Sequence, residues 1–436
     1  MDQRRFWILL ISLHLLFMGK QLFWSNSILQ DSKEYLFAAE NLLQHQTLYS
    51  WNLNHAFNAD WLSKRPILYP LILALFKTIS FGSNFVFLLL VYLSQNAASL
   101  FSFSLCVKIL NYLKIRINWK HASIFILFSL SQLIYSNTIM SETYLQLCLC
   151  ALVYIQICKP SNFNWSLISA LILVCGLALK PVLMPFAYAY PFICLLRFLP
   201  KFDLKYFFPS LLPLVFIFIT ISWNQSRTGY KQYSSISTIN LLHYNTYTML
   251  MYKYGEHKAD SMVDEIHFKG NLLRSYPAKQ EYINKSCSLL ITENLGTYVF
   301  LHLRGMAFCV LDPGRFDLSQ FFGLSHGKNL LYETNKDNAA RRIFDSILNP
   351  LGILLVILFV FNLFKLILIL KFLSDKKLGL FIRLTLFCFP LYTVFLTGPI
   401  GASRFLMPVI PLVFVMVLSL NNWRLLKRRE GDSKTI

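Results

Sequence analysis

The chain has 436 residues, of which 56% are hydrophobic and 14% are charged, and its mean hydropathy is +0.50. Soluble globular domains are about 45–50% apolar and about 25% charged, so this composition excludes a water-soluble enzyme and a disordered tail. The 41 Lys and Arg residues against 21 Asp and Glu residues give a net charge of +20, and the basic cytoplasmic loops of membrane proteins explain such an excess without nucleic acid as a partner. The sequence therefore predicts an all-α polytopic membrane protein.

Apolar runs of nearly the ~20 residues that a bilayer-spanning helix needs recur along the chain. The first run, 6–24, follows Arg4 and Arg5 and lacks a small-residue cleavage site, so we expect a retained anchor and not a signal peptide. The run at 67–80 has only about 14 residues and carries Lys77, which suits an interfacial or re-entrant helix better than a span. About ten spans are predicted, at residues 6–24, 83–107, 122–138, 143–158, 165–179, 182–198, 206–223, 347–371, 378–397 and 405–421.

Basic residues predict the orientation of these spans. If 67–80 does not cross, the basic short loops and both termini all fall on one side, as cytoplasmic segments do. These loops are 108–120, Lys159, 197–205 and 371–377. We therefore expect both termini inside, and the compact loops favour a bacterial inner membrane.

This topology divides the chain into three parts. The first is an N-terminal transmembrane module, 1–223, with an outer loop at 25–66. An extracytoplasmic insert, 224–346, is too polar for lipid and is expected to fold as a small helical domain. The C-terminal transmembrane helices occupy 347–436.

Two acidic residues stand beside apolar runs on the predicted outer face. Asp31 opens the segment DSKEYLFAAENLL, which has the spacing of an amphipathic helix with Glu34 one turn further on. Glu142, in SNTIMSETYLQL, lies among polar residues that indicate a wetted pocket. Ionisable residues at membrane depth are functional candidates. The ordinary alternatives are a helix N-cap for Asp31 and a helix-start charge for Glu142.

Four basic residues are candidates for a cationic site at the outer headgroup level. Lys180 in GLALKPVLMP and Arg404 in GPIGASRFLMPVIP end long apolar runs, where snorkelling to the interface is the ordinary explanation. Arg65 of KRPILYP and Arg227 of WNQSRTGY lie in outer segments. If the four converge, they suit a lipid-linked phosphate, because arginine matches phosphate oxygens in a bidentate way.

An outer carboxylate, interfacial cations and a deep apolar body together indicate chemistry on a lipid-phosphate substrate. In a sugar transfer from a polyprenyl phosphate, the acid takes the proton of the acceptor hydroxyl as it attacks the anomeric carbon. The cations stabilise the charge that grows on the departing lipid phosphate.

The order of these motifs resembles the class C glycosyltransferases, which share the GT-C fold. Within that class, the motifs are similar to the dolichyl-phosphate-mannose protein mannosyltransferase and lipid A aminoarabinose transferase group. The resemblance rests on DSKEY, KRPILYP, YSNTIMSET, ALKPVLMP, WNQSRTGYKQYSSISTINLL, LDPGRFDLSQFFG and GASRFLMPVIPL, which together cover most of the chain.

The resemblance implies an integral-membrane inverting glycosyltransferase. Such an enzyme takes a hexosyl or pentosyl unit from a polyprenyl-phosphate donor and passes it to a lipid, glycan or protein acceptor on the outer face. It gives Asp31 the acceptor-activating role and Glu142 the place of a second active-site acid. The donor-phosphate candidates it implies are Arg65, Lys180 and Arg404, and Arg227 joins them on its own chemistry alone.

The resemblance also bears on cofactors and partners. Some relatives hold a metal with an acidic residue two positions before the proline of the second-loop motif, but this chain has Lys64 there, so a divalent metal is doubtful and no cofactor is required. His243, His257 and His267 are irregularly spaced, as solvated surface histidines are. The implied partners are the sugar donor, the acceptor and membrane lipid, without nucleic acid.

Two other classes of protein stay open. A flippase or transporter of a lipid-linked precursor would keep the cationic outer cavity but would need a matching inner one. A non-catalytic assembly subunit would keep the fold without the reaction.

Overall fold

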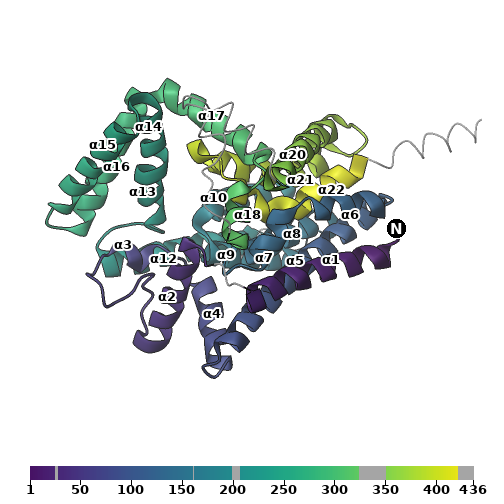
Figure 1. Ribbon diagram of the computed structural model, residues 1–436, viewed down its shortest axis with the longest axis horizontal. Helices are drawn as coiled ribbons and strands as arrows, with labels where there is room; N and C mark the ends of the chain where they lie inside the picture. The colour runs from purple at the N-terminus through teal and green to yellow at the C-terminus, as the bar shows by residue number, and fades with distance from the viewer. Residues whose placement is uncertain (25–27, 161, 199–206, 324–349, 421–436) are drawn as a thin grey trace, which may run out of the picture.

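A computed structural model of the chain describes residues 1–24, 28–160, 162–198, 207–323 and 350–420. These residues form helices joined by loops, and no strand occurs among them (Figure 1), so the predicted all-α class is confirmed. Most of the basic loop predicted at 197–205 and the basic residues after position 420 lie outside the described residues.

Within the described ranges, four helical segments are long and apolar enough to cross a membrane. They are α1 (Gln3–Gly19) continued by η1 (Lys20–Trp24), α5 (Asn84–Tyr112), η4 (Phe208–Leu211) continued by α12 (Leu212–Thr228), and α20 (Pro350–Ser374). Shorter apolar helices are α4 (Leu68–Ile79), α8 (Glu142–Cys158), α9 (Phe163–Leu179), η2 (Pro181–Leu183) with α10 (Met184–Phe198), α17 (Leu295–Leu311), α21 (Leu380–Leu396), and η8 (Ser403–Val409) with α22 (Ile410–Ser419). Each of the ten predicted runs overlaps helical structure, as expected for an integral membrane protein.

The run predicted as one span at 122–138 differs from expectation because it is broken in two. It forms α6 (Trp119–Leu127) and α7 (Leu130–Ser136). At the break, the Ser129 hydroxyl donates to the carbonyl oxygen of Phe125 at 2.7 Å and the backbone of Ser129 leaves the helical region. A break of this kind is tolerated at membrane depth where other groups satisfy the freed backbone atoms, as the Ser129 hydroxyl does here.

The polar residues around Glu142 are buried. Their backbone and side chains are bound by amide side chains from neighbouring helices. Gln95 of α5 donates to the carbonyl oxygen of Thr138 at 2.8 Å, and Gln132 and Gln146 exchange hydrogen bonds at 2.7 and 2.9 Å. The wetted pocket expected at this turn stays a prediction, and the network fixes the start of α8.

The first loop folds beside the membrane-length helices. It contains α2 (Gln30–His45) and α3 (Asp60–Ser63), and α2 packs along α4. In Figure 1, α2 and α4 run across the direction of α1. The 12 residues of α4 span about 18 Å, which is shorter than the ~30 Å hydrocarbon core, and the interfacial or re-entrant helix expected there stays a prediction.

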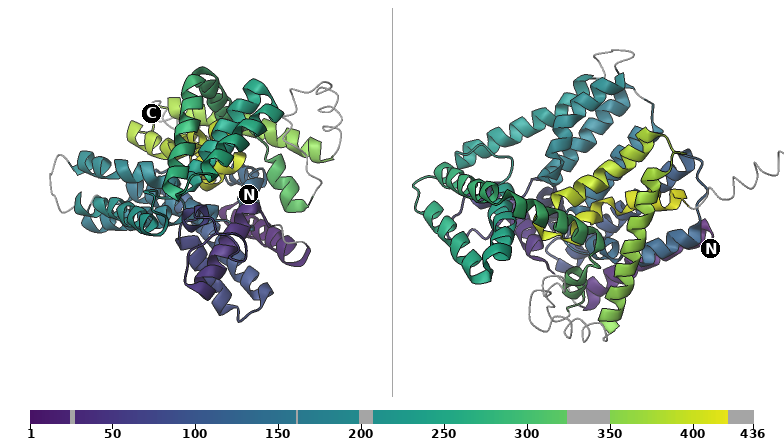
Figure 2. Two further views of the ribbon diagram at one scale, coloured as in Figure 1. Left: turned by 90° about the vertical axis from the view of Figure 1, so that its left-hand side faces the viewer. Right: turned by 90° about the horizontal axis from the view of Figure 1, so that it is seen from above.

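The predicted insert contains a helical unit with its own apolar cluster, centred on Leu242, Leu250 and Ile283. Its helices stand apart from the main body (Figures 1 and 2). They are α13 (Ile236–Asn240), η5 (Leu241–Thr246), α14 (Tyr247–Tyr254), α15 (Glu256–Asn271) and α16 (Tyr276–Glu293). Helix α17, then α18 (Arg315–Phe322), leads back to the main body. The carboxylate of Asp60 accepts hydrogen bonds from Tyr276 at 2.9 Å and links this unit to the first loop.

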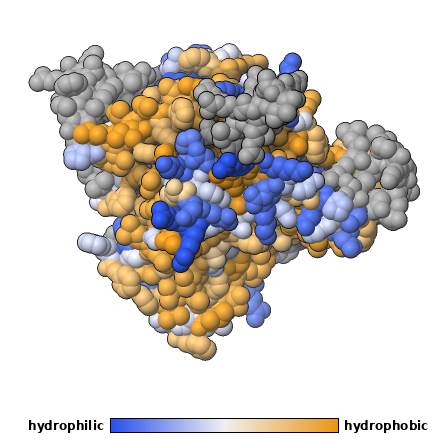
Figure 3. All heavy atoms as spheres, turned by 90° about the vertical axis from the view of Figure 1, so that its right-hand side faces the viewer, coloured by the Kyte–Doolittle hydropathy of each residue, from blue (hydrophilic) through white to orange (hydrophobic). Residues whose placement is uncertain are grey.

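The N-terminus and α6 lie together at one end of the molecule, at the right of Figure 1. The hydroxyl of Ser123 lies 3.0 Å from the sulfur of Met1. Arg4, Arg5 and Arg116 are exposed. Figure 3, seen from this side, shows hydrophilic side chains gathered across the middle of a largely apolar surface. The first loop lies at the opposite end of α1.

Candidate functional site

Asp31 lies between two arginines that come from distant parts of the chain. Its Oδ1 is 2.8 Å from Nη2 of Arg65, and its Oδ2 is 3.0 Å from Nη2 of Arg404. The N-cap of α2 is Leu29, so the alternative that Asp31 caps this helix is wrong. The amphipathic spacing of α2 is confirmed, because Tyr35 and Ala39 are buried against the main core while Asp31 faces the cations. The carboxylate is thus committed to ion pairs and not to the helix backbone.

Glu34 extends the ion-pair network from the next turn of α2. Its Oε2 binds Nη2 of Arg65 at 2.6 Å, and its Oε1 binds Nζ of Lys64 at 2.9 Å. Sequence reasoning noted Glu34 but gave it no role. The available signal was its spacing of three residues from Asp31. Residues three apart share a helix face, so both acids can reach the consecutive cations Lys64 and Arg65.

Glu142 and Lys180 form a second ion pair, with Oε1 and Nζ 2.6 Å apart. Helix α8 begins at Glu142 and α9 ends just before Lys180, and the two helices pack against each other, so the start of one meets the end of the other. The side chain of Glu142 is 2% exposed and that of Lys180 is 21% exposed. Lys180 therefore does not snorkel away but binds a buried acid.

The two ion-pair groups belong to one electrostatic site. Burial alone would raise the pKa of Asp31, but the positive charges of Arg65, Arg404 and Lys180 outweigh burial and hold that pKa well below its ordinary value. Arg65 is itself buried, which would lower its pKa, yet the carboxylates of Asp31 and Glu34 raise it. The site thus keeps Asp31 ionised and its cations charged.

Close packing of glycines sets the position of Arg404. The segment before it forms η7 (Gly398–Ile400) and then Gly401, whose φ is +67°. A Cβ on Gly401 would lie 2.8 Å from the carbonyl oxygen of Gly305 in α17. Glycine is needed at positions 305 and 401, because a side chain at either would push the segment before Arg404 away from α17. The backbone before Arg404 therefore rests directly on α17.

Arg227 is not brought into this cluster. Its guanidinium donates to the carbonyl oxygens of Leu48 and Leu62 at 3.2 and 2.7 Å, and to Oδ1 of Asn224 at 2.6 Å. It also stacks over the ring of Trp223 at 3.8 Å. These contacts fasten the first loop to α12, which is a structural use of the side chain.

Asp317 is a further acid of the site that sequence reasoning missed. The hydroxyl of Tyr135 donates to its Oδ1 at 2.7 Å. Burial raises the pKa of Asp317 to about 6; the Tyr135 hydrogen bond and the charge of Arg404 oppose this rise, and the charge of Asp312 adds to it. The acid lies in the segment LDPGRFDLSQFFG, whose second aspartate was the available signal.

An apolar groove adjoins the charged cluster. Its cavity volume is about 230 Å³, and it lies between α6, α17, α20, α21 and η8, partly open to the surroundings. Ser403, next to Arg404, and Asp312 are polar residues of its lining. Lys365 is the one basic lining residue, with Nζ 5.2 Å from the ring centre of Phe361. The other walls are almost entirely aliphatic and aromatic side chains.

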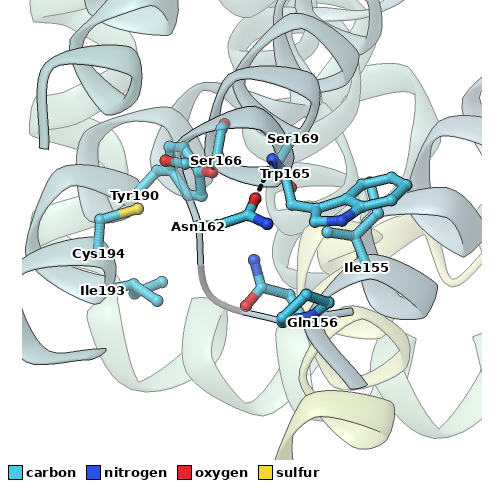
Figure 4. Close-up of a pocket in the computed structure, with 10 residues that line it drawn as sticks. Ile155, Gln156, Asn162, Trp165, Ser166, Ser169, Tyr190, Ile193 and Cys194 are labelled. Carbon is cyan, nitrogen blue, oxygen red and sulfur yellow. Dashed lines mark hydrogen bonds between the residues drawn. The ribbon is translucent and has the colours of Figure 1, made fainter. Parts of the chain in front are cut away.

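A smaller pocket lies far from the cluster, near the other end of α8. It is lined by residues that include Gln156, Asn162, Trp165 and Tyr190 (Figure 4). Gln156 is 14 residues beyond Glu142 on α8, or about 21 Å along the helix. This pocket is therefore separate from the charged site.

Two of the three insert histidines lie close together. The rings of His243 and His267 are 6.3 Å apart, and His257 is exposed on α15. No group of three or more His, Cys, Asp or Glu residues in the described ranges is placed to hold a metal ion. At the position where some relatives carry a metal-binding acid, Lys64 binds Glu34 instead.

The sequence matches no protein-family model and no curated protein. In structure, the chain is similar to the archaeal oligosaccharyltransferase AglB from Archaeoglobus fulgidus, solved with an inhibitory peptide and a dolichol-phosphate, with 9% identity and a TM-score of 0.48 over 98% of this chain and 52% of that chain. It is also similar to ArnT from Cupriavidus metallidurans, solved in the apo state and bound to undecaprenyl phosphate, with 10% identity and a TM-score of 0.37 over 96% of this chain and 78% of that chain.

Both proteins are glycosyltransferases of the GT-C fold, the group that the motifs resemble. The chain spans about half the length of AglB. At these identities and TM-scores, a function for this chain has to come from its own residues.

Proposed function

We propose that the chain is an inverting glycosyltransferase of the membrane, which moves a sugar from a polyprenyl-phosphate donor to a lipid, glycan or protein acceptor. One observation carries the proposal. Asp31, from the first loop, lies within ion-pair distance of Arg65 and of Arg404, which is 373 residues further along the chain, beside an apolar groove. An acid, two guanidinium groups and a lipid-sized groove are the parts that this reaction needs.

The donor phosphate binds at the cationic side of the cluster. Arg404 is the more accessible arginine, with 36% of its side chain exposed against 9% for Arg65. Guanidinium groups bind phosphate oxygens through paired hydrogen bonds, and Lys180 adds a charge nearby. Arg65, already bound by Asp31 and Glu34 of α2, holds the site in shape, so Arg404 is the principal phosphate ligand.

The polyprenyl chain of the donor lies in the groove next to Ser403. The groove walls are apolar, and burial of each CH₂ group of a lipid chain contributes about 0.8 kcal/mol. The position of Ser403, which lines the groove and directly precedes Arg404 in the chain, supports a phosphate site next to this end of the groove. The carrier can therefore place its phosphate at the cations and its chain in the groove.

Asp31 activates the acceptor. The acceptor hydroxyl gives its proton to the Asp31 carboxylate while its oxygen forms a bond to the anomeric carbon. The bond from that carbon to the phosphate oxygen breaks, and its electron pair stays on the phosphate, where Arg404 and Lys180 stabilise the charge. One displacement from the face opposite the phosphate inverts the anomeric configuration.

Phosphate binding also makes Asp31 a better base. With both arginines bound, its pKa is held low, and a carboxylate with a low pKa accepts a proton poorly. When phosphate oxygens take over Arg404, Asp31 loses one of its two cations and its pKa rises. Donor binding thus prepares the acid for the acceptor.

The reaction takes place on the outer face, with both termini in the cytoplasm. Support comes from the exposed Arg4, Arg5 and Arg116 at the end of the molecule that carries the N-terminus, opposite the first loop. A bacterial inner membrane fits this arrangement. The reaction as written needs no cofactor, because ammonium and guanidinium groups stabilise the leaving phosphate.

The test is transfer by the full chain in liposomes. Undecaprenyl phosphate linked to radiolabelled glucose, mannose or arabinose is incubated with extracted cell-envelope lipids as acceptor. We expect labelled acceptor and free undecaprenyl phosphate, and about tenfold or greater loss in Arg404→Gln, since a charged hydrogen bond contributes about 1.5–3 kcal/mol. Movement of the labelled lipid across the bilayer without transfer would instead identify a flippase.

The control is Glu40→Gln, which lies on the same helix as Asp31. Glu40 pairs with Lys77 at the surface, where the two side chains are 41% and 35% exposed. Surface pairs contribute little to stability, so transfer should stay near the wild-type rate.

A further inference from the structure

Two buried carboxylate oxygens near Arg404 have no hydrogen-bond partner in the described part of the chain. They are Oε2 of Glu142 and Oδ2 of Asp317. The other oxygen of each group is engaged, with Lys180 at 2.6 Å and with Tyr135 at 2.7 Å. Both residues are more than nine-tenths buried, at 2% and 6% exposure. An unpaired buried acceptor is costly, so both oxygens call for a donor that a ligand can bring.

The two acids belong to one place in the fold. Helix α8, which carries Glu142, is tied to η8 by the hydrogen bond from Gln146 to the carbonyl oxygen of Met407 at 3.1 Å. Helix α18, which carries Asp317, packs on α7, and α7 packs on both α8 and η8. The charges of Glu142 and Arg404 both act on Asp317. The acids therefore lie around Arg404, where the proposed phosphate binds.

Asp317 also lies beside the polar end of the groove. The Cβ position of Gly314 is 3.9 Å from Oδ2 of Asp317, 3.6 Å from Oγ of Ser131 and 3.7 Å from Oγ of Ser403. Both serines line the groove. The unpaired oxygen of Asp317 is thus next to the end of the groove that adjoins Arg404.

The two unpaired carboxylate oxygens determine which ligand can bind. Carboxylate oxygens only accept hydrogen bonds, so the ligand must bring O–H or N–H donors. Lys180 already balances the charge of Glu142, so the ligand need not be a cation. A sugar ring joined to a phosphate at Arg404 brings several hydroxyl donors to this place. Charge-assisted hydrogen bonds of this kind are stronger than neutral ones.

We propose that Glu142 and Asp317 form the subsite for the donor's sugar ring and accept hydrogen bonds from its hydroxyl groups through Oε2 and Oδ2. This assignment rests on the proposed function. Tyr135 is a positioning residue, because its hydroxyl holds the other oxygen of Asp317 and so orients the carboxylate.

The test compares two lipids with the same carrier. Binding to the full chain in nanodiscs is measured for undecaprenyl phosphate, and for the undecaprenyl-phosphate sugar (glucose, mannose or arabinose) that the wild type binds most tightly. Asp317→Asn should weaken binding of the sugar-bearing lipid about 10- to 100-fold, the range for one hydrogen bond to a charged group. Binding of undecaprenyl phosphate should stay within about twofold, since the variant leaves Arg404 and Arg65 in place.

Two more variants separate a sugar contact from a loss of folding. Glu142→Gln should also weaken binding of the sugar-bearing lipid, and because it releases Lys180, it should not weaken binding of undecaprenyl phosphate. Tyr135→Phe keeps the acid and should weaken only the sugar-bearing lipid, by less than Asp317→Asn does. A merely structural role would weaken both lipids together. Glu40→Gln should change neither.

The outcomes distinguish the two proposals. Equal binding of the sugar-bearing lipid by wild type and all three variants, or parallel loss of both lipids, would overturn the sugar subsite while the transferase proposal stands. A wild-type chain that binds neither lipid would overturn the proposed function itself.

Discussion

At the scale of single residues, the site is an ion-pair network whose acids and cations hold each other. Asp31 has one arginine on each oxygen, at 2.8 and 3.0 Å, and its side chain is 18% exposed. Removing one partner of such a partly buried ion pair is strongly destabilising, because the charge left behind has no partner. The same groups therefore stabilise the resting protein and, by our proposal, carry out the reaction.

The ion pairs of Asp31 predict a pH-dependent stability. Because the pKa of Asp31 is lowered in the folded chain, its pairs stabilise the fold above the ordinary value of 3.8 and are lost as pH falls through the folded pKa. Asp31→Asn should reduce the free energy of unfolding by about 1.5–3 kcal/mol at pH 7, and the difference from wild type should shrink below pH 3.8. Thermal unfolding in detergent, followed by tryptophan fluorescence at pH 7 and below pH 3.8, measures this difference in the free energy of unfolding. A difference that does not change with pH would contradict it.

Only some of these residues could be found from the sequence. Asp31, Arg65, Glu142 and Lys180 lie near apolar boundaries, where a charge is conspicuous. Asp317 was missed because its motif alone does not separate it from an ordinary acid near a helix start, and its burial depends on α7. Arg227 was wrongly included among the candidates for the phosphate site. Its sequence setting is like that of Arg404, but in the fold, carbonyl oxygens of the first loop occupy its guanidinium.

At the scale of elements, the site depends on close approaches that the apolar pattern does not reveal. Hydrophobic periodicity predicted most helices, but it did not predict the break between α6 and α7. That break depends on the Ser129 hydroxyl, which donates to the carbonyl oxygen of Phe125 there. Likewise, the need for glycine before Arg404 becomes clear only in the fold, where α17 packs against this segment.

The contact between α17 and η7 predicts a sensitive glycine. Gly305→Ala would place its Cβ 3.0 Å from the carbonyl carbon of Pro399 and against the carbonyl oxygen of Gly398. Overpacking costs about 1–3 kcal/mol, and the shift should move Arg404 and reduce transfer. Gly296→Ala, on the same helix with no atom within 4 Å of its Cβ position, is the control. Thermal unfolding and transfer rates test both, and equal behaviour of the two variants would contradict the packing argument.

The groove predicts a dependence on chain length. Val394 of α21 lines it, and Val394→Phe should narrow it. We expect about tenfold slower transfer from undecaprenyl-phosphate donors but near-normal transfer from a donor with a two-isoprene chain, because only the long chain needs the groove. Leu363→Phe, on the exposed side of α20, should leave both rates unchanged. Equal loss with both donors would show that Val394 does not contact the chain.

At the scale of the whole molecule, the site joins segments from almost the entire chain. The 373 residues between Asp31 and Arg404 leave no local signal of their contact. Motif order and a shared predicted face placed them on the same side of the membrane, but their pairing depends on how α2, α8, η8 and α18 pack. The sequence could thus indicate parts of the site, while the ion pairs required the fold.

The predicted orientation makes two loops differ in accessibility. His257 on α15 and Arg116 between α5 and α6 are both exposed, and we place them outside and inside, respectively. A membrane-impermeant maleimide should label His257→Cys in intact cells, whereas Arg116→Cys should react only after permeabilisation. Labelling of Arg116→Cys in intact cells would contradict the proposed topology.

The most direct measurement is single-turnover transfer by Asp31→Asn with the donor already bound. The variant should bind undecaprenyl phosphate at least as tightly as the wild type, because Arg404 no longer has a competing carboxylate. Transfer should fall by about 10²–10⁴-fold, the usual contribution of a general base. Turnover close to the wild-type rate in the folded, donor-bound variant would contradict the account, because no acid in the first loop would then be needed to activate the acceptor.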